Sequence, residues 1–423
     1  MVKEVSITNI ELFKRKALYW ASSLNTACVF DSNNFTDPYS KFDWLLAADA
    51  EATLETKVGT AFTDLKSLKK QHPNKWLTGF LSYDLKNELE DFFPKQTDEL
   101  EFPDLFFFVP KHLLRLKKGR LKIISAEPEA VLAAIDQTEI FQTESKPEIQ
   151  IKARISKEIY LEKAEQIRQQ IKLGNIYITN FCQEFYAENA EIDPKFVFDQ
   201  LNSVSPTPFA CFFKAGNKYI LSASPERFLA KRGNKLISQP IKGTAARSNF
   251  AQQDQHQKNT LKNSIKEQAE NVMIVDLVRN DLTKSAVFGS VKVEELFGIY
   301  SFKQVHQMIS TITAEISDDV DSIDALINTF PAGSMTGAPK FRAMQLMQQF
   351  EGSKRSIYAG SIGYFSPDGD FDFNVVIRSL LYNAENQYLS FHVGSAVTFQ
   401  SNPELEYEEC LLKASAIRQV LNS

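Results

Sequence analysis

The chain has 423 residues, of which 43% are hydrophobic, and its formal net charge at pH 7 is −5. This length suits one large domain or two to three average ones, and the hydrophobic fraction is ordinary for a globular protein with a sizeable core. Acidic and basic residues are interspersed and no stretch reaches transmembrane length, so we expect neither a nucleic-acid-binding face nor a membrane segment. The N-terminus lacks the pattern of a signal peptide and the four cysteines are isolated in the sequence, which favours a cytoplasmic protein with reduced thiols.

The N-terminal residues 1–125 have the composition of a sheet-forming subdomain. A strand is predicted at Val5–Ile10, a helix at about 12–24 and a second strand at Ala27–Ser32. The apolar segment Phe102–Pro110 is bounded by prolines and too short for a lone helix, so we expect a buried strand there. No catalytic chemistry can be identified in this part of the sequence.

Residues 126–150 are acidic, polar and flanked by proline, which indicates a linker or an exposed connection. Residues 151–423 are then expected to form the catalytic domain. Ser156 is a suitable cap for a helix that ends before Gly174, and strand composition begins at Ile176.

The following segments alternate between polar connections, helices and strands. The polar stretch Gly243–Asn259 is predicted to connect to a helix over Lys262–Leu282, and Ile299–Ile316 is compatible with a helix or with extended structure. Phe330–Phe350 is predicted as a glycine-containing loop that leads into a helix, and it lacks the spacing of a phosphate-binding P-loop.

The C-terminal part is predicted to contain two strand pairs and a helix. Ala359–Phe365 is expected to pair with Phe373–Tyr382, and Tyr388–Phe399 follows as a further strand. The last helix is predicted to begin near Pro403, with Asn402 as its cap and the proline at the first helical position.

Two pairs of carboxylates have the same spacing in the two predicted helices. Glu267 and Glu270 are three residues apart, as are Glu406 and Glu409, so each pair shares one helix face. If the pairs meet in a partly closed site, they would raise one another's pKa and resist ionisation unless a cation held them together. An all-oxygen ligand set with room for water suits Mg²⁺. The alternative is that both pairs are solvated helix faces.

Seven motifs, spread over about residues 160–423, resemble those of the chorismate-utilising enzymes, and within them component I of aminodeoxychorismate synthase and of anthranilate synthase. They are SPERF, PIKGT, AENVMIVDLVRNDL, VHQMIS, GSMTGAPK, YAGSIGYF and PELEYEECLLKA. The resemblance implies an α+β fold in which two large antiparallel β-sheets pack face to face with helices on the outside. It also implies an active site in the cleft between the sheets.

The resemblance assigns the glutamates to a magnesium site that holds a carboxylate of chorismate. Glu270 and Glu409 would be direct ligands, and Glu267 and Glu406 would act through bound water. Lys413 follows Glu409 by four residues on the same helical face, where it can meet the substrate carboxylate or offset the acidic cluster. The alternative role for Lys413 is an ion pair with Glu409 that only stabilises the helix.

The resemblance also assigns residues to the rest of the substrate. Tyr358 and Arg378 would bind the other carboxylate, for which an arginine fork is better suited than a lysine. Gly394 would bring backbone N–H groups close to this carboxylate, although Ala396 stands where the family usually has a further glycine. The remaining implied substrate-binding residues are Gly243, Thr244, Ser334 and His306. His306 would lie against the ring; otherwise it would be a core histidine.

Lys242 decides which reaction the resemblance implies. Anthranilate synthases typically have alanine at this place in the motif, whereas aminodeoxychorismate synthases have lysine. A neutral lysine amine can add at C2 of chorismate while the C4 hydroxyl departs, and ammonia then adds at C4 and expels the lysine. Glu226 would be the general acid that protonates the leaving hydroxyl. The expected product is 4-amino-4-deoxychorismate, a precursor of 4-aminobenzoate and folate; the alternatives are anthranilate synthesis and a chorismate-binding protein without turnover.

The source of ammonia is expected to be a separate glutamine amidotransferase subunit. A glutaminase needs a nucleophilic cysteine on a glycine-flanked turn, and none of the four cysteines has such neighbours. Ile178 stands where isochorismate and salicylate synthases have a lysine that activates water, and an isoleucine cannot act as a base. It also departs from the polar residue usual in the nitrogen-using members, which leaves Asn180 and Gln183 as candidates for lining an ammonia path.

Overall fold

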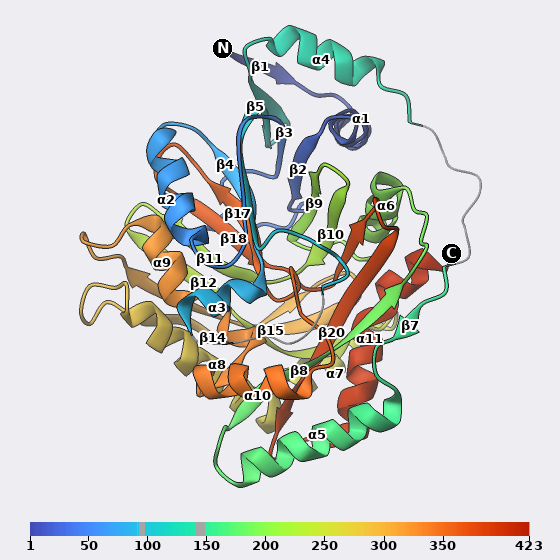
Figure 1. Ribbon diagram of the computed structural model, residues 1–423, viewed down its shortest axis with the longest axis vertical. Coiled ribbons are helices and arrows are strands. Elements are labelled where there is room, and N and C mark those ends of the chain that lie inside the picture. Colours follow the sequence, from blue (N-terminus) through green and yellow to red (C-terminus); the bar gives the residue numbers. More distant parts are fainter. Residues whose placement is uncertain (91, 93–97, 141–148, 423) are drawn as a thin grey trace.

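A computed structural model describes residues 1–90, 92, 98–140 and 149–422 (Figure 1). Within these residues twenty strands pair in one continuous antiparallel network. The network divides into two arms at the pair formed by β3 (Trp44–Thr56) and β5 (Leu105–Lys117).

The first arm continues from β3 through β2 (Thr26–Asp31), β9 (Phe209–Ala215), β10 (Lys218–Ser224), β19 (Ser379–Asn383), β20 (Tyr388–Thr398) and β8 (Ile178–Ala187). At its two ends β8 also pairs with β7 (Lys152–Ala153) and β16 (Gly337–Ala338). The second arm continues from β5 through β4 (Leu77–Leu81), β17 (Ser361–Phe365), β18 (Phe371–Val375), β11 (Arg227–Arg232), β12 (Lys235–Gln239) and β15 (Val305–Glu315). It ends with β13 (Ile241–Ala246) and β14 (Lys292–Ser301), while β6 (Arg120–Ile124) and β1 (Val2–Ser6) extend the other end of β5.

An aromatic core lies between the inner faces of the two arms. Phe80 of β4 and Phe213 of β9 meet edge to face with ring centroids 5.3 Å apart, and both are fully buried. Such contacts add to the stabilisation from burial of the rings. The predicted α+β fold of two packed antiparallel sheets is therefore confirmed, and the two sheets are arms of one hydrogen-bonded network.

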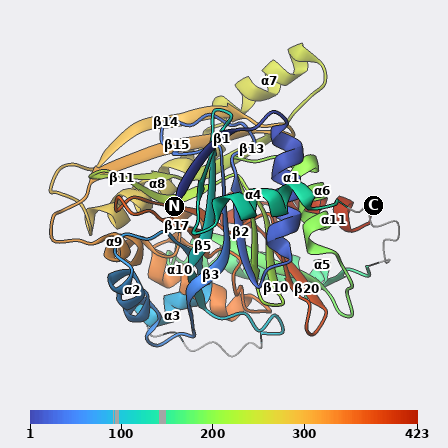
Figure 2. The same ribbon diagram turned by 90° about the horizontal axis from the view of Figure 1, so that it is seen from above.

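Helices cover the outer faces of both arms (Figures 1 and 2). The first arm is covered by α1 (Ile10–Ser22), α4 (Pro128–Gln137), α5 (Lys157–Lys172), α6 (Pro194–Val204), α10 (Lys340–Phe350) and α11 (Pro403–Leu421). The second is covered by α2 (Ala61–Gln71), α8 (Ile265–Thr283) and α9 (Ser322–Thr329). The short helix α3 (Lys86–Leu89) follows the 3₁₀ turn η1 (Tyr83–Leu85), and α7 (Ala251–Lys262) lies beside β13 and projects from the molecule in Figure 2. None of the helices in the described ranges is both long and apolar enough to cross a lipid bilayer.

The N-terminal part shares the sheet with the rest of the chain, because β2 pairs with β9 and β4 pairs with β17. Within the predicted linker, α4 buries Val131 and Ile135 in the core that also contains residues of α1. Residues 141–148 of that segment lie outside the described residues. The division of the chain at 126–150 stays a prediction.

Candidate active site

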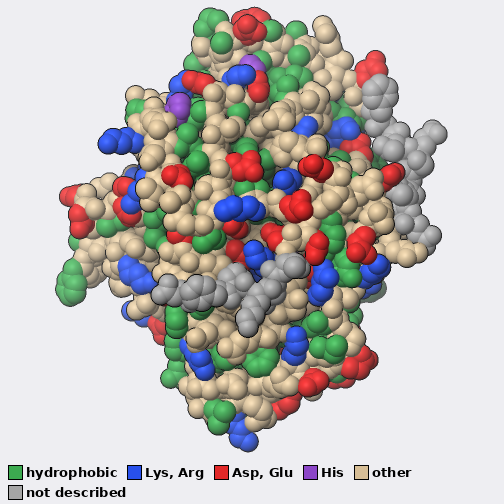
Figure 3. Space-filling view, viewed as in Figure 1, with side chains coloured by type: hydrophobic (Ala, Val, Ile, Leu, Met, Phe, Trp, Pro, Cys, Tyr) green, Lys and Arg blue, Asp and Glu red, His purple; other side chains and the backbone are tan. Residues whose placement is uncertain are grey.

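A cavity of about 400 Å³ lies where the two arms meet α8 and α11. The first arm contributes Asn180 and Gly394, and the second contributes Lys242 and Gln307. Its charged lining residues are Glu226, Glu267, Glu270, Glu409, Lys242, Lys266, Lys413 and Arg378. Four acidic groups thus face four basic ones inside the cavity, whereas Figure 3 shows both signs interspersed over one outer face.

The two glutamate pairs converge on this cavity. Ser264 and Asn402 accept backbone hydrogen bonds at the N-termini of α8 and α11, and Pro403 is the first residue of α11, as predicted. Glu267, Glu270 and Glu409 line the cavity, and the Glu406 carboxylate is buried close to them. The pKa of Glu270 is raised to about 7, mainly by burial; the charge of Lys242 opposes this rise and the neighbouring Glu267 carboxylate contributes to it.

Lys266 lies between the two helices. Its Nζ is 3.4 Å from Oε1 of Glu406 and 3.7 Å from Oε1 of Glu270. Oε1 of Glu270 is buried and has no hydrogen-bond partner in the described structure. Among the residues that the structure describes, no three aspartate, glutamate, histidine or cysteine side chains lie close enough together to enclose a metal ion. Lys266 was not among the site residues predicted from the sequence, although its spacing of four residues from Glu270 is a helical contact spacing.

Lys242 extends from β13 and donates a hydrogen bond from Nζ to the carbonyl oxygen of Ser334, 3.2 Å away. Burial lowers the pKa of its ammonium group, and Glu270 opposes this effect. The next residue, Gly243, has a φ of +92°, and a Cβ there would lie 3.1 Å from Oε2 of Glu267. Glycine therefore allows β13 to approach α8, and Thr244 follows it in the cavity lining.

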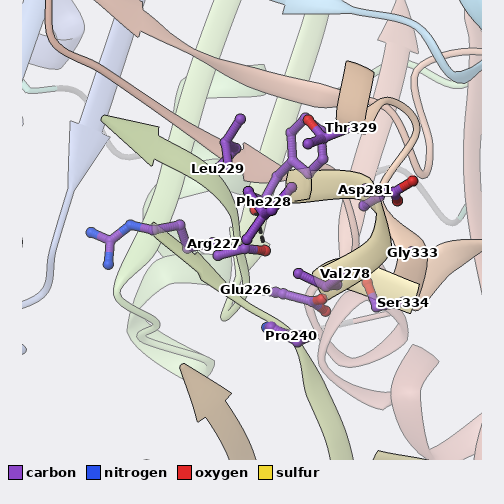
Figure 4. Close-up of a pocket in the computed structure, with 13 residues that line it drawn as sticks. Glu226, Arg227, Phe228, Leu229, Pro240, Val278, Asp281, Thr329, Gly333 and Ser334 are labelled. Carbon is purple, nitrogen blue, oxygen red and sulfur yellow. Dashed lines mark hydrogen bonds between the residues drawn. The ribbon is translucent and has the colours of Figure 1, made fainter. Parts of the chain in front are cut away.

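Glu226 occupies the turn between β10 and β11 and is 4% exposed. Burial raises the pKa of its carboxyl to about 7, even though a hydrogen bond from Ser334 and the charge of Lys242 act in the opposite direction. Figure 4 shows the Glu226 side chain directed toward Ser334 of the 3₁₀ turn η2 (Gly333–Met335), beside a cavity of about 10 Å³. Arg227 points the opposite way, where it pairs with Asp372 at 3.0 Å and holds the turn.

Tyr358 and Arg378, both predicted from the sequence as site residues, line the cavity. Tyr358 is buried before β17 and stacks on His392, with ring centroids 5.2 Å apart. Arg378 lies between β18 and β19 with a φ of +51°. Non-glycine residues seldom adopt this left-handed conformation, and it is often found where function fixes a side chain. Burial lowers the pKa of the Arg378 guanidinium, while the negative charge of Glu226 counteracts this.

Gly394 and Lys413 connect β20 with α11. Lys413 donates from Nζ to the carbonyl oxygen of Gly394 at 2.8 Å and pairs with Glu409 at 2.7 Å. A Cβ at Gly394 would lie 2.7 Å from Sγ of Cys182, so close packing against β8 requires glycine here. Ala396 lies two residues further along β20, and the strand predicted for this segment is confirmed.

His306 is not brought to the cavity. Its Nε2 is 3.0 Å from Oδ1 of Asp254 on α7, and its Nδ1 is 2.8 Å from Oγ of Ser301. The adjacent residue Gln307 lines the cavity instead, and its buried Oε1 has no hydrogen-bond partner among the described residues. Successive side chains of a strand point to opposite faces, so β15 can present only one of these two residues to the cavity.

Arg355 holds two walls of the cavity in place. It was not among the site residues predicted from the sequence. It donates from Nη1 to the carbonyl oxygen of Met335 at 2.7 Å and from Nη2 to that of Asn180 at 2.9 Å. Glu351 balances its charge at 2.6 Å and accepts a hydrogen bond from the backbone of Cys182. The sequence around it offers no motif that would reveal this role.

Comparison with known proteins gives a family match over most of the chain. The family model described as chorismate binding enzyme matches residues 17–419. Aminodeoxychorismate synthase component 1 of Salmonella typhimurium is 41% identical over 264 residues, which are 62% of this chain and 58% of the relative. The protein of the same name from Bacillus subtilis is 30% identical over 386 residues, which are 87% of this chain and 80% of the relative.

A solved structure shows the same fold. Anthranilate synthase component I from Streptococcus pneumoniae superposes with a TM-score of 0.78 at 26% sequence identity, covering 90% of this chain and 93% of that one. The matched region of the Salmonella protein is less than two thirds of its length.

Proposed function

Because the chain belongs to the family of chorismate-binding enzymes, we propose that it is component I of an aminodeoxychorismate synthase, which converts chorismate and ammonia to 4-amino-4-deoxychorismate. The observation that carries this proposal is the position of Lys242 in the same buried cavity as Glu226. The names of the Salmonella and Bacillus relatives support it.

Lys242 is suited to nucleophilic addition because burial favours its neutral amine. In the proposed first step, Nζ forms a bond to C2 of chorismate, the two ring double bonds shift from C1=C2 and C5=C6 to C1=C6 and C4=C5, and the C4–O bond breaks. In the second step, ammonia forms a bond to C4, both double bonds return to their first positions, and the C2–N bond breaks to release the lysine amine. The product then carries its nitrogen at C4.

Glu226 is suited to supply the proton for the first step. With a pKa of about 7, a large share of this carboxyl is protonated at neutral pH, so it can give a proton to the C4 oxygen, which leaves as water. The resulting carboxylate can take back the proton that ammonia brings to C4. Ser334 forms hydrogen bonds with both Glu226 and Lys242: its side chain bonds the Glu226 carboxyl, and its carbonyl oxygen accepts from Nζ of Lys242.

In this proposal the cavity holds the two carboxylates of chorismate and a magnesium ion. Arg378 and Tyr358, which line the cavity, would bind one carboxylate, and Lys413 lies on the wall near Glu409. The acceptor-only glutamates and the unpartnered Oε1 of Glu270 fit Mg²⁺, with Glu270 and Glu409 as direct ligands and Glu267 and Glu406 acting through water. When bound, the ion would offset the acidic charge and attract the second carboxylate.

We further propose that a glutamine amidotransferase subunit supplies the ammonia and that the protein acts in the cytoplasm. The four cysteines are all buried. A thiol enclosed in this way is not available as the nucleophile of a glutaminase. The name component 1 of the relatives is consistent with a second component.

Identification of the product tests the function. The purified chain would be incubated with chorismate, Mg²⁺ and ammonium salt, with a parallel sample lacking ammonium, and aminodeoxychorismate would be detected by mass spectrometry or as 4-aminobenzoate after addition of a lyase. Anthranilate fluorescence in its place would reverse the assignment. Absence of any product, even with a glutaminase partner, would favour a non-catalytic binding protein.

A further inference from the structure

Lys266 connects the two helices that carry the glutamates. It is the second residue of α8, and its ammonium group reaches Glu270 on the same helix and Glu406 on α11. In the described part of the chain, no other basic side chain forms an ion pair with either of these two carboxylates. Both carboxylates are buried, at 6% and 2% exposure.

A buried carboxylate without a cation is costly, so this lysine stabilises the arrangement of α8 and α11 in the metal-free protein. The contacts are loose, however. At 3.4 and 3.7 Å they are longer than a charge-assisted hydrogen bond, and Oε1 of Glu270 keeps an open acceptor site. The lysine therefore offsets charge without using all the oxygen lone pairs.

We propose that Lys266 is an internal counter-ion that occupies the metal-free site and is displaced into solvent when Mg²⁺ binds. This proposal rests on the proposed magnesium site. Displacement requires little rearrangement, because the Lys266 side chain is already 42% exposed and has a long flexible stem. The affinity of the site for Mg²⁺ is then set by competition between the ion and the ammonium group for the same oxygens.

The charge of the cavity makes this competition necessary. The lining has four acidic and four basic groups. A divalent ion added beside Lys266 would meet a repulsive neighbour at close range in a medium of low dielectric constant. When Lys266 moves to solvent, its charge no longer competes with the ion for the oxygens of Glu270 and Glu406.

The proposal predicts an order of magnesium affinities that can be measured without turnover. Isothermal titration calorimetry would follow Mg²⁺ binding to the full chain, free of chorismate, at one fixed pH. Lys266→Met removes the competitor and should tighten binding by about tenfold, equivalent to about 1.4 kcal/mol. Lys266→Arg places a bidentate cation on the carboxylates and should weaken binding relative to the wild type. Lys262→Met, at the exposed end of α7, removes the same charge nearby and should change the affinity less than twofold.

Thermal unfolding provides a second readout. In EDTA, Lys266→Met should unfold at a lower temperature than the wild type, and Mg²⁺ should stabilise this variant more than the wild type. Unchanged or weaker Mg²⁺ binding by Lys266→Met would overturn the proposal. Because product formation is assayed separately, an aminated product together with equal affinities refutes only the counter-ion, whereas the predicted order of affinities without product refutes only the function.

Discussion

Replacement of Glu226 by glutamine should remove a pH-dependent cost of folding. Burial raises the pKa of this carboxyl from 4.5 to about 7, so the folded state favours the neutral acid. The folded chain then binds more protons than the unfolded chain between these two pKa values, and the stability contributed by Glu226 falls as the pH rises through this window. Glutamine has nearly the same shape and does not ionise.

The size of the effect follows from the shift in pKa. A shift of this extent corresponds to about 3 kcal/mol, of which about 2.5 kcal/mol arises between pH 5 and pH 8. The free energy of unfolding of Glu226→Gln minus that of the wild type should therefore grow by this amount over the interval. For a chain of 423 residues, the corresponding change in melting temperature is about 3 °C.

Urea unfolding followed by circular dichroism, with EDTA present at each pH, measures this difference. Glu162→Gln, on the exposed face of α5, is the matched control and should show no comparable trend. The activity of Glu226→Gln should fall by at least 100-fold. A stability difference that does not change with pH would mean that Glu226 ionises as easily as a surface glutamate, and its role as a neutral acid would lose its basis.

Four further substitutions test separate parts of the site. Lys242→Ala should reduce formation of the C4-aminated product by at least 100-fold, as measured by mass spectrometry, and unchanged turnover would exclude the covalent step. Arg378→Lys should raise KM for chorismate by roughly tenfold in steady-state kinetics, because a bidentate contact is lost, and an unchanged KM would place the carboxylate elsewhere. Glu270→Gln should weaken Mg²⁺ binding by more than tenfold in calorimetry, and retained affinity would exclude it as a direct ligand. Arg355→Met should lower the free energy of unfolding by about 3–5 kcal/mol in urea titrations because Glu351 is left buried and unpaired, and a smaller loss than that of a surface arginine would contradict this reasoning.

Local signals in the sequence were sufficient for the helices that carry the glutamates. The predicted cap Asn402 and the first helical residue Pro403 are confirmed in α11. Helical spacing also placed each glutamate pair on one face. The meeting of the pairs depends on two helices more than a hundred residues apart, so only the resemblance between motifs could suggest it.

Other elements depend on pairing partners that local patterns do not show. The predicted strand ending at Pro110 continues through this proline to Lys117 in β5, because the register shift between Ala50 and Ala52 of β3 accommodates it. The segment 243–259 was predicted as a polar connection, but α7 begins at Ala251. This helix is polar on nearly all sides and buries Leu261, so it gives no apolar periodicity to recognise.

Single-residue assignments were the least predictable part of the site. The alternation of β15 places Gln307 rather than His306 on the cavity wall, and a one-residue change of register reverses which face a side chain occupies. Lys266 and Arg355 could not be selected, because their roles follow from contacts with Glu406 and Asn180 on other elements.

The pairing of β2 with β9 and of β4 with β17 has a practical consequence for work on shortened forms of the protein. A recombinant fragment that starts at residue 151 would leave an uncovered row of amide and carbonyl groups along β9 and another along β17. Unprotected strand edges of this kind recruit further copies of a chain, so such a fragment would accumulate as aggregates. Loss of Phe80, Phe106 and Phe108 would also remove aromatic neighbours of Phe213. Crystallisation and directed-evolution studies should therefore keep the first 125 residues in the expressed polypeptide.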